Sequence, residues 1–550
     1  MIGLTLVVTT LLLSAPDQRP GCEGLATLPL DGGTVTGSEA IGPGEWKAPD
    51  GKLLTDLPAT CRVTLRLQPG AGSSIQAEVW LPRERWNGRL LGTGNGSYGG
   101  VIFHDDLADG VASGFATVND DMGTAPAKGL DGSPLVGQPV KWLDFGWRAT
   151  HTTAVAAKQV VEAFYGRSPH HAYFVGCSSG GRQALMEAQR FPEDYDGIVA
   201  GCAAREFTRN ISQVVWMHRA LRASAEASPS PEGLQALRKA VLASCGPTDS
   251  GPAGEPWLVD PARCTFDPDA IRCGATSGGP DCLTGAQVDA VRKIYAGPRN
   301  PRTGAQIYPG LPRGAEPVRY WAFLAGQPQP PWDGIFRWVF GPTWDAATFD
   351  FDRDEATLEA VLGPLLDASS PDLSRFARRG GKLLIWHGWS DPLNPAGASV
   401  DYYRQLAAAQ PGGLVSLRRF ARLFLVPGVD HCAGGPGADG FWAARPASAP
   451  DPEHDMLMAL VRWVEQGVAP SRIVASKFLD DEPRKGVAFQ RPPVPVPGGR
   501  PVPGQRGSDA GLELFLPRSS VTRMWSWPYS CCGSRATGTI RVKRSMCSSP

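Results

Sequence analysis

Ser178 lies at the centre of the pentapeptide Gly-Cys-Ser-Ser-Gly, residues 176–180. A serine hydroxyl becomes a nucleophile only when a base removes its proton, and a neutral imidazole is the usual base. An apolar run at 171–176 predicts a short buried strand before the pentapeptide, and the spacing that follows predicts a helix. Strand, tight glycine turn and helix form the context in which a G-x-S-x-G serine acts as nucleophile. The pattern therefore predicts acyl-transfer chemistry at Ser178.

Two later residues could complete a catalytic triad with Ser178. Asp391 follows the predicted strand KLLIWHGWS, and His431 follows the predicted strand RLFLVPGVD. The chain order serine, acid, histidine, with the last two placed after late strands, is that of the α/β-hydrolase fold. In such a triad Asp391 orients His431, which takes the proton of the serine. The sequence therefore predicts an α/β-hydrolase fold.

Other residues near these positions have competing interpretations. Asp430 adjoins His431 and is an alternative acid, although sequence neighbours rarely orient each other in a triad. Ser179 is an alternative nucleophile, but its place in the pentapeptide better suits a backbone N–H that stabilises the oxyanion. The glycine-rich loop 92–100 either supplies a second such N–H near Gly96 or is simply a tight turn. Three more residues are expected to be structural: His151, His387 and Ser390.

A cysteine stands beside two of the predicted catalytic residues. Cys177 precedes Ser178, and Cys432 follows His431. If the serine and the histidine approach within hydrogen-bond reach, the two cysteines are brought together as well. A disulfide between them would fasten the two catalytic loops and close 432 − 177 = 255 residues of chain. The alternative is a pair of buried free thiols.

Composition and the N-terminal residues bear on localisation and on partners. Lysine plus arginine and aspartate plus glutamate are both 54, so no net charge draws the chain to nucleic acid or to an anionic membrane. The apolar run from Ile2 to Leu13 is too short to span a bilayer and predicts a signal peptide at 1–21, with a buried strand as the alternative. Twelve cysteines favour an oxidising compartment. We expect a secreted or periplasmic protein, and no oligomeric state is predicted.

The middle of the chain differs from both flanks. Residues 205–346 contain clustered cysteines and a block rich in tryptophan, which predicts an inserted lid domain stapled by disulfides. Trp321, Trp332 and Trp338 could offer the lid an aromatic surface for a flat acyl group, or could pack its own core. Residues 22–204 and 347–493 are then the two parts of the catalytic domain.

The chain resembles the tannase and feruloyl esterase family, which are α/β-hydrolases with a lid that cleave esters of phenolic acids. The resemblance runs from about Cys22 to Gln490 and is most specific in four stretches, WRATHTTAVAAKQVVEAFYG, YFVGCSSGGRQALMEAQRFPEDYDGIVAG, WHGWSDPLNP and VPGVDHCAGG. It implies the triad of Ser178, Asp391 and His431. It also implies four disulfides, Cys177–Cys432, Cys22–Cys61, Cys245–Cys264 and Cys273–Cys282, and leaves Cys202 as a buried free thiol.

Members of this family usually hold a calcium ion in an acidic loop of the lid, and calcium needs several oxygen ligands. In the corresponding stretch, CGPTDSGPAGEPWLVDPARC, Asp249 is the one acid that clearly remains. Prolines and an apparent two-residue insertion disturb the spacing of the others. A structural calcium at Asp249 is therefore poorly supported, and the ester chemistry itself requires no cofactor.

The sequence thus predicts a serine carboxylesterase whose partner is a small aromatic ester. A hydrolase of synthetic aromatic monoesters, such as those of terephthalate, is one alternative. A catalytically silent binding protein of the same fold is another, although such a protein need not keep all three triad residues.

The last part of the chain departs from the family. Residues 491–515 are rich in proline and glycine, and the first cysteine that follows residue 491 is Cys531. The family, in contrast, ends on a proline-rich segment that contains a paired cysteine. Codons can be chosen for these residues so that, when one base is removed from the coding sequence, the shifted reading frame encodes such a family-like ending. We expect residues 494–550 to be an aberrant, disordered tail produced by a one-base shift of the reading frame, with no selected partners for its cysteines.

Overall fold

The computed structural model describes residues 21–249, 254–274, 279–316, 318–442, 446–492 and 494–495. The predicted signal peptide lies outside the described residues, apart from residue 21. So does the predicted tail, apart from its first two residues, which form a short strand at the edge of the main sheet.

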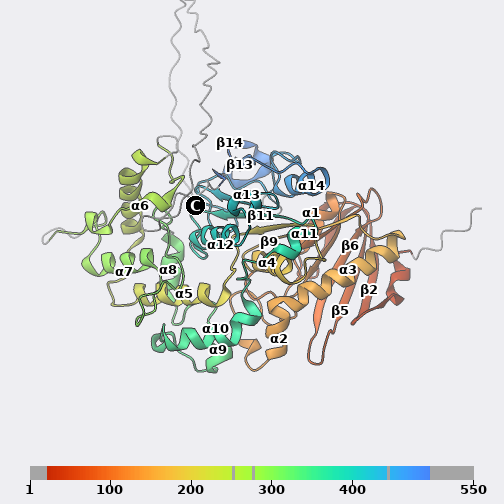
Figure 1. Ribbon diagram of the computed structural model, residues 1–550, viewed down its shortest axis with the longest axis horizontal. Helices are drawn as coiled ribbons and strands as arrows, with labels where there is room; N and C mark the ends of the chain where they lie inside the picture. The colour runs from red at the N-terminus through yellow and green to blue at the C-terminus, as the bar shows by residue number, and fades with distance from the viewer. Residues whose placement is uncertain are drawn as a thin grey trace, which may run out of the picture. The chain divides into compact units, whose positions relative to one another are not determined.

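A mixed sheet of eleven strands forms the centre of the described chain, in the order β1-β2-β5-β6-β8-β7-β9-β10-β11-β12-β15 (Figure 1). Neighbouring strands from β8 to β12 are parallel. The strands at both edges are antiparallel to their neighbours. The strands are β1 (Pro29–Leu30), β2 (Gly33–Ile41), β5 (Thr60–Leu67), β6 (Ile75–Pro82), β7 (Arg89–Thr93), β8 (Ala116–Asp120), β9 (His171–Cys177), β10 (Gly197–Gly201), β11 (Lys382–Gly388), β12 (Ala421–Val426) and β15 (Val494–Pro495).

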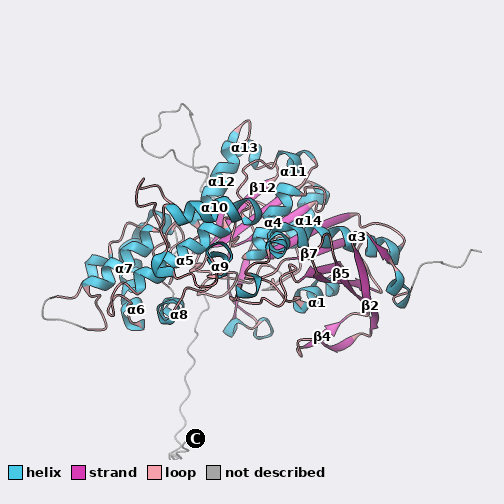
Figure 2. Ribbon diagram, turned by 90° about the horizontal axis from the view of Figure 1, so that it is seen from below, coloured by secondary structure: helices cyan, strands magenta, loops and turns pink. Residues whose placement is uncertain are grey.

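Helices cover both faces of this sheet (Figure 2), and two antiparallel hairpins lie outside it. The helices are α1 (His104–Ala112), α2 (Pro139–Leu143), α3 (Ala149–Tyr165), α4 (Ser179–Arg190), α5 (Phe207–Leu221), α6 (Pro231–Cys245), α7 (Gly285–Ala296), α8 (Val318–Gly326), α9 (Gly334–Phe340), α10 (Arg353–Leu366), α11 (Ser374–Arg378), α12 (Gly397–Ala408), α13 (Gly413–Leu417) and α14 (Met456–Gln466). The hairpins are β3 (Gly44–Lys47) with β4 (Leu53–Leu57), and β13 (Ala475–Phe478) with β14 (Val487–Arg491).

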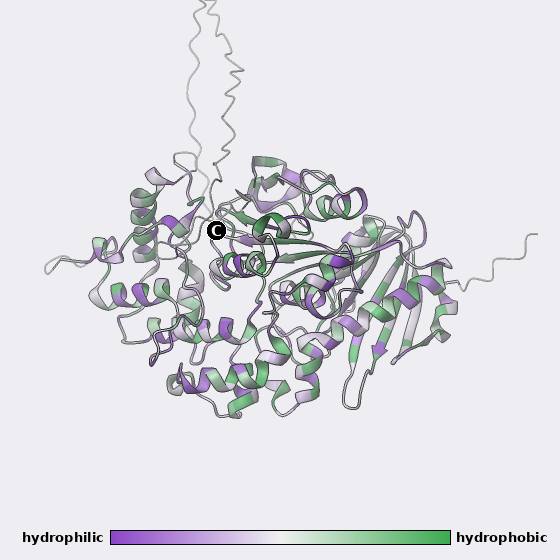
Figure 3. Cartoon of the chain, viewed as in Figure 1, coloured by the Kyte–Doolittle hydropathy of each residue, from purple (hydrophilic) through white to green (hydrophobic). Residues whose placement is uncertain are grey.

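Strand β9, which leads to Ser178, is apolar on both of its faces. Ala172 and Phe174 belong to one buried cluster with residues of α3 and α4, whereas Tyr173 and Val175 belong to another with residues of α14. Successive side chains of a strand point to opposite faces, so a central parallel strand needs apolar residues throughout. Colouring by hydropathy shows apolar residues gathered along the central strands (Figure 3). This two-sided burial fixes the end of β9 and therefore the position of Ser178.

The segment between β10 and β11 is a helical insertion that contains α5 to α11. Most of its N-terminal helices, α5 to α8, lie together on one side of the sheet (Figure 1). They share a buried cluster of their own, which includes Leu234, Val288 and Trp321. The segment predicted as a lid, 205–346, lies within this insertion, and α10 and α11 extend the insertion toward β11.

Four disulfides join parts of the described chain. Cys22–Cys61 ties the N-terminal segment to β5, and two short-range disulfides, Cys245–Cys264 and Cys273–Cys282, staple the insertion. Cys177–Cys432 joins the end of β9 to the loop after β12 across 255 residues. These are the four pairs that the family resemblance implies, and Cys202 is free and buried.

None of the helices in the described ranges is both long and apolar enough to cross a membrane.

Replacing Cys177 and Cys432 together by alanine is expected to lower the melting temperature by roughly 5 °C or more. The disulfide closes a loop of 255 residues, for which chain entropy alone gives about 5 kcal/mol as an upper value. Differential scanning calorimetry measures the shift. Cys202→Ala is the matched control, because it removes a neighbouring buried thiol without opening a disulfide. An unchanged melting temperature, with both thiols alkylated in the unreduced wild-type protein, would contradict the prediction.

Candidate active site

Ser178 stands in a sharp turn between β9 and α4. Its φ of 63° and ψ of −121° lie in a region that residues with a side chain rarely adopt. Glycines make this turn possible, because a Cβ on Gly94 would lie 2.5 Å from the Cα of Gly180. A Cβ on Gly176 would lie 2.5 Å from the carbonyl oxygen of Gly180. The geometry is that of a nucleophile elbow, in which the serine side chain is presented at the end of the sheet.

The loops after β11 and β12 bring Asp391 against His431. The Nδ1 of His431 lies 2.7 Å from Oδ2 of Asp391. The aspartate is fully buried, whereas the histidine keeps 17% of its side-chain surface exposed. Ser178 and His431 line the same cavity. The structure therefore brings the three predicted triad residues to one site, with the aspartate behind the histidine.

The Asp391 carboxylate is held by further hydrogen bonds. Its Oδ1 accepts the backbone N–H groups of Leu393 at 2.8 Å and Asn394 at 2.9 Å. Its Oδ2 also lies 3.2 Å from Nε2 of His387, so this histidine does more than fill the core. Burial acts to raise the pKa of Asp391, but the charge of His431 and hydrogen bonds from both histidines outweigh it and hold the pKa well below the usual range. The acid therefore stays ionised at neutral pH.

Asp430, the alternative acid, differs from Asp391 in its surroundings. None of the described hydrogen bonds joins its carboxylate to His431. Burial, together with the nearby charge of Asp391, raises the pKa of Asp430 to about 6. A carboxyl group that is half-protonated near pH 6 is a weaker partner for an imidazole than one that stays ionised. The geometry therefore favours Asp391.

Ser179 is placed to act through its backbone. It is the first residue of α4, where an N–H has no partner within the helix. Its hydroxyl donates to the carbonyl of Ser97 at 2.7 Å, so the side chain is already engaged. This arrangement favours Ser179 as an oxyanion donor over Ser179 as a nucleophile.

The loop after β7 offers a second donor near Gly96. The N–H of Gly94 donates to a carbonyl of β9 at 2.9 Å, and that of Asn95 donates to Oε1 of Gln183 at 2.8 Å. No described hydrogen bond uses the N–H of Gly96 or Ser97, and both residues line the cavity at Ser178. Ser97 has a φ of 50°, a left-handed conformation that no local sequence pattern predicts. Either N–H is available to an oxyanion.

The remaining residues expected to be structural are accounted for by contacts away from Ser178. His151 stacks on Phe191 at 3.9 Å between ring centroids and lies 2.6 Å from Asp194. Ser390 lies in the turn after β11, where its N–H donates to the carbonyl of Val429 at 3.0 Å.

Two hollows that share several lining residues border Ser178. The main cavity has a volume of about 450 Å³ and is lined by aromatic residues, Phe103, Trp332 and Trp442, and by the acids Asp105 and Asp106. The inner hollow, about 20 Å³, is lined by Phe207, Ile211 and Val214 of α5 and also by Trp332. Trp332 lines both hollows. Ser178 therefore has apolar walls in both hollows, as small-molecule sites commonly do.

Of the three tryptophans that could offer an aromatic surface or pack the core of the insertion, Trp332 lines the cavity at Ser178. Trp321 is fully buried in the cluster of the insertion. Trp338 is also buried, and its Nε1 donates to the carbonyl of Gly132 at 2.8 Å. Trp332 has a φ of 62°, and Tyr98 Oη donates to its carbonyl at 2.7 Å. Phe103, Trp442 and the acidic pair were not predicted, because no local pattern marks them.

The described residues around Asp249 do not form a set of calcium ligands. Its two carboxylate oxygens accept the backbone N–H groups of Val259 at 2.5 Å and Asp260 at 3.0 Å. Within the described residues, no cluster of three potential metal ligands includes Asp249. A calcium ion needs several oxygen ligands around it, and the acid here serves to close a loop instead.

Asp391→Asn is expected to flatten the dependence of stability on pH. The pKa of Asp391 is lowered in the folded protein, whereas an unfolded aspartate titrates near about 3.9. The carboxylate therefore adds stability above about pH 4 that is lost as the pH falls toward the folded pKa, with a slope of up to about 1.4 kcal/mol per pH unit. Asparagine cannot titrate, so the variant lacks this component. Urea unfolding between pH 6 and pH 2 measures the free energy of unfolding of both proteins. If the difference between wild type and variant were the same at every pH, the prediction would be wrong.

Comparison with known proteins identifies the family. Residues 61–332 and 339–497 match the family described as tannase and feruloyl esterase. An uncharacterized esterase of Xanthomonas campestris pv. campestris is 36% identical over 94% of this chain and 95% of its own length. A probable feruloyl esterase B-2 of Aspergillus flavus is 36% identical over 78% of this chain and 82% of its own.

A solved structure agrees with these relatives. The crystal structure of feruloyl esterase B from Aspergillus oryzae superposes with a TM-score of 0.79 at 30% identity, over 86% of this chain and 95% of that one. The likeness covers the mixed sheet and the helical insertion together. The chain therefore belongs to the tannase and feruloyl esterase family and is a carboxylic ester hydrolase.

Proposed function

We propose that this protein is an exported serine esterase that cleaves esters of phenolic or other aromatic acids through an acyl-enzyme. One observation carries the proposal. Ser178 stands in a nucleophile elbow at a cavity with aromatic walls, beside a histidine that is bonded to a buried, ionised aspartate. The names of the relatives, feruloyl esterase B among them, support an aromatic acyl group.

In the proposed mechanism, His431 removes the proton of Ser178 as the serine oxygen attacks the ester carbonyl. Asp391 keeps the proton on Nδ1, which leaves Nε2 free to act as the base, and stabilises the imidazolium that forms. Because the aspartate is buried and accepts several N–H groups, it does not need to reorganise during the reaction. This rigidity lowers the cost of separating charge in the transition state.

The carbonyl oxygen becomes negatively charged in the tetrahedral intermediate. The N–H of Ser179 at the start of α4 and an N–H of the loop at Gly96 are proposed to bind it. A helix N-terminus also favours a negative charge nearby. Collapse of the intermediate breaks the bond to the alcohol, which takes the proton from His431. Water, activated by the same histidine, then releases the aromatic acid from Ser178.

The disulfides support the part of the proposal that concerns export. Four disulfides join the described residues. Two of them link cysteines that are only 9 and 19 residues apart in the sequence. Disulfides of this kind form and persist in oxidising compartments. Fractionation of the producing cells would test the proposal, and the full-length protein in the reduced cytosol would count against it.

Hydrolysis assays test the function directly. The purified protein is expected to cleave methyl ferulate, methyl gallate or a terephthalate monoester, with p-nitrophenyl acetate as a general ester control. Ranking kcat/KM over the three aromatic acids identifies the acyl group. If no ester is cleaved by a folded protein that still binds these compounds, a silent binding protein becomes the better explanation.

Ser178→Ala, His431→Ala and Asp391→Asn are each expected to lower kcat by roughly 10⁴-fold or more, because the three residues act as one unit. The double variant of Ser178 and His431 should lose little beyond either single variant. Asp430→Asn is the matched control and should keep near wild-type kcat. A variant Asp391→Asn that stays active, with an inactive Asp430→Asn, would reassign the acid.

A second prediction concerns the charge of the alcohol. Asp105 and Asp106 both line the main cavity. Asp105 forms an ion pair with Lys52 at 2.6 Å, whereas none of the described ion pairs involves Asp106. Burial, and then repulsion from Asp109 and Asp105, raises the pKa of Asp106 to about 7. At pH 8 it is therefore mainly ionised, and an ester whose alcohol carries a carboxylate should react more slowly than its neutral counterpart.

Asp106→Asn should narrow this difference in kcat/KM by about fivefold at pH 8, as expected for one like-charge contact of about 1 kcal/mol. The effect should be smaller at pH 6, where the wild-type carboxyl is mostly protonated. Asp109→Asn is the control, since Asp109 lies on the same helix but does not line the cavity. An equal effect of both variants would show that only the overall charge of α1 matters.

A further inference from the structure

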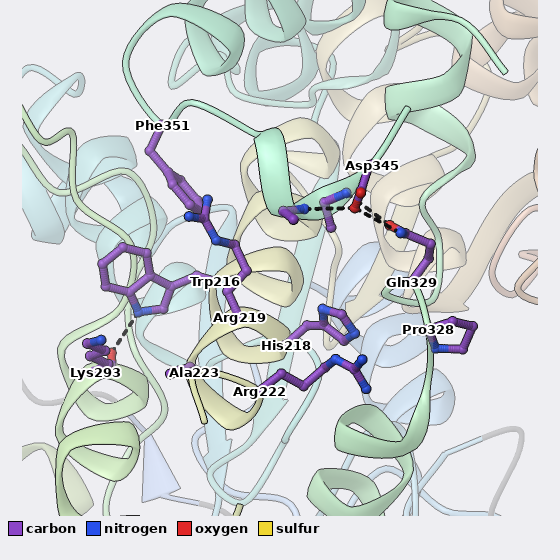
Figure 4. A pocket seen from close by; sticks show the side chains of 13 residues that line it. Trp216, His218, Arg219, Arg222, Ala223, Lys293, Pro328, Gln329, Asp345 and Phe351 are labelled. Carbon is purple, nitrogen blue, oxygen red and sulfur yellow. Dashed lines mark hydrogen bonds between the residues drawn. The ribbon is translucent and has the colours of Figure 1, made fainter. Parts of the chain in front are cut away.

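A second cavity lies on the helical insertion and shares no lining residue with the hollows at Ser178. Its volume is about 630 Å³, larger than that of the main cavity. Its walls come from the C-terminal half of α5, from α7 and from the segments at 328–329 and 345–351 (Figure 4). The chemistry proposed at Ser178 does not involve this cavity.

Three cations line this cavity without an acidic partner. Arg219, Arg222 and Lys293 form no ion pair with any carboxylate of the described residues. One N–H group of each guanidinium is anchored on a backbone carbonyl at 2.8 Å, that of Phe349 for Arg219 and that of Ala325 for Arg222. An arginine has five N–H donors, so most of them remain available. The anchors hold the two charges in place before any ligand binds.

The other titratable groups in the walls do not neutralise these charges. Asp345 is the one carboxylate there, and its Oδ1 accepts the N–H of Ala347 at 3.0 Å and Nε2 of Gln329 at 2.9 Å. His218 donates to the carbonyl of Gln327 at 3.0 Å if its proton is on Nε2. Burial, and the nearby charge of Arg222, lower the pKa of His218, so it is neutral at pH 7. Three positive charges thus face one negative charge.

Arg219 and Arg222 both come from the end of α5, but their side chains extend in different directions, beside an aromatic surface. Arg219 extends toward Phe351 and lies over its ring at 5.8 Å, whereas Arg222 extends toward Pro328 (Figure 4). The rings of Trp216 and Phe351 meet edge to face at 5.2 Å, and Nε1 of Trp216 donates to the carbonyl of Lys293 at 2.8 Å. Because the two arginine side chains diverge and Lys293 comes from α7, a chain of rings with spaced carboxylates fits these cations better than a single compact anion does.

We propose that this cavity binds an acidic oligosaccharide, a short chain of uronic acid residues. Its carboxylates would accept hydrogen bonds from the free N–H groups of Arg219 and Arg222, and the apolar face of a sugar ring would pack against Trp216 and Phe351. The volume, about 630 Å³, is far larger than a phosphate needs and lies in the range of sites for ligands of several rings. The inference stands on the cavity itself and does not depend on which ester Ser178 cleaves.

Isothermal titration calorimetry of the full-length wild-type protein with trigalacturonate tests the proposal. We expect saturable binding at one site that weakens as sodium chloride is raised, because salt screens exposed charges. The double variant Arg219→Gln/Arg222→Gln should bind at least tenfold more weakly. Its kcat/KM on methyl ferulate should equal that of the wild type, which shows that the variant is folded and that the site is separate from Ser178.

The controls separate this site from charge in general and from other anions. Arg375→Gln/Arg404→Gln removes the same charge from two exposed ion pairs elsewhere, and it should leave binding unchanged. A neutral trisaccharide should not bind. Four results would overturn the proposal: no binding of trigalacturonate, equal binding by the Arg219→Gln/Arg222→Gln variant, equal binding of inorganic phosphate, or binding of ferulate in place of the trisaccharide.

Discussion

The buried carboxylate of Asp391 is the point on which the site depends. It accepts N–H groups from two backbone amides and lies within hydrogen-bond distance of two imidazoles, His431 and His387. A charge without solvent is stable only when such partners surround it. The partners come from β11, from the loop that follows it and from the loop after β12, so the parallel pairing of these two strands is what assembles them. His387 in turn is fixed by Ser399, whose Oγ lies 2.7 Å from Nδ1.

Helix α5 connects the hollows at Ser178 to the rest of the insertion. Phe207, Ile211 and Val214 from its first half line the inner hollow, whereas Trp216 and Arg219 from its second half line the cavity on the insertion. The inner hollow of about 20 Å³ is too small for an aromatic ring as it stands. Entry of such a ring on that side requires Trp332 or α5 to move. The same helix thus forms part of the wall of both the inner hollow and the second cavity.

Local pattern and chain order were enough to predict the elements around the nucleophile. The predicted strand at 171–176 and the helix after Ser178 correspond to β9 and α4. Asp391 and His431 could be nominated because strand ends mark them. Trp442, Asp106 and Ser97 could not, because they reach the cavity through loops and helices whose packing is decided by distant residues. Trp321 and Trp338 show the same limit, since the pattern that suggested a binding surface equally suits a core.

The free thiol of Cys202 shows how burial protects the disulfide beside Ser178. The sulfur atoms of Cys202, Cys177 and Cys432 lie within 4.8 Å of one another, which would permit exchange between thiol and disulfide. Exchange requires a thiolate. Burial, and then the charge of Asp391, raise the pKa of Cys202 well above its ordinary value, so the thiolate is scarce at neutral pH. The carboxylate that orients His431 therefore also disfavours attack on the covalent link that holds the loops of Ser178 and His431 together.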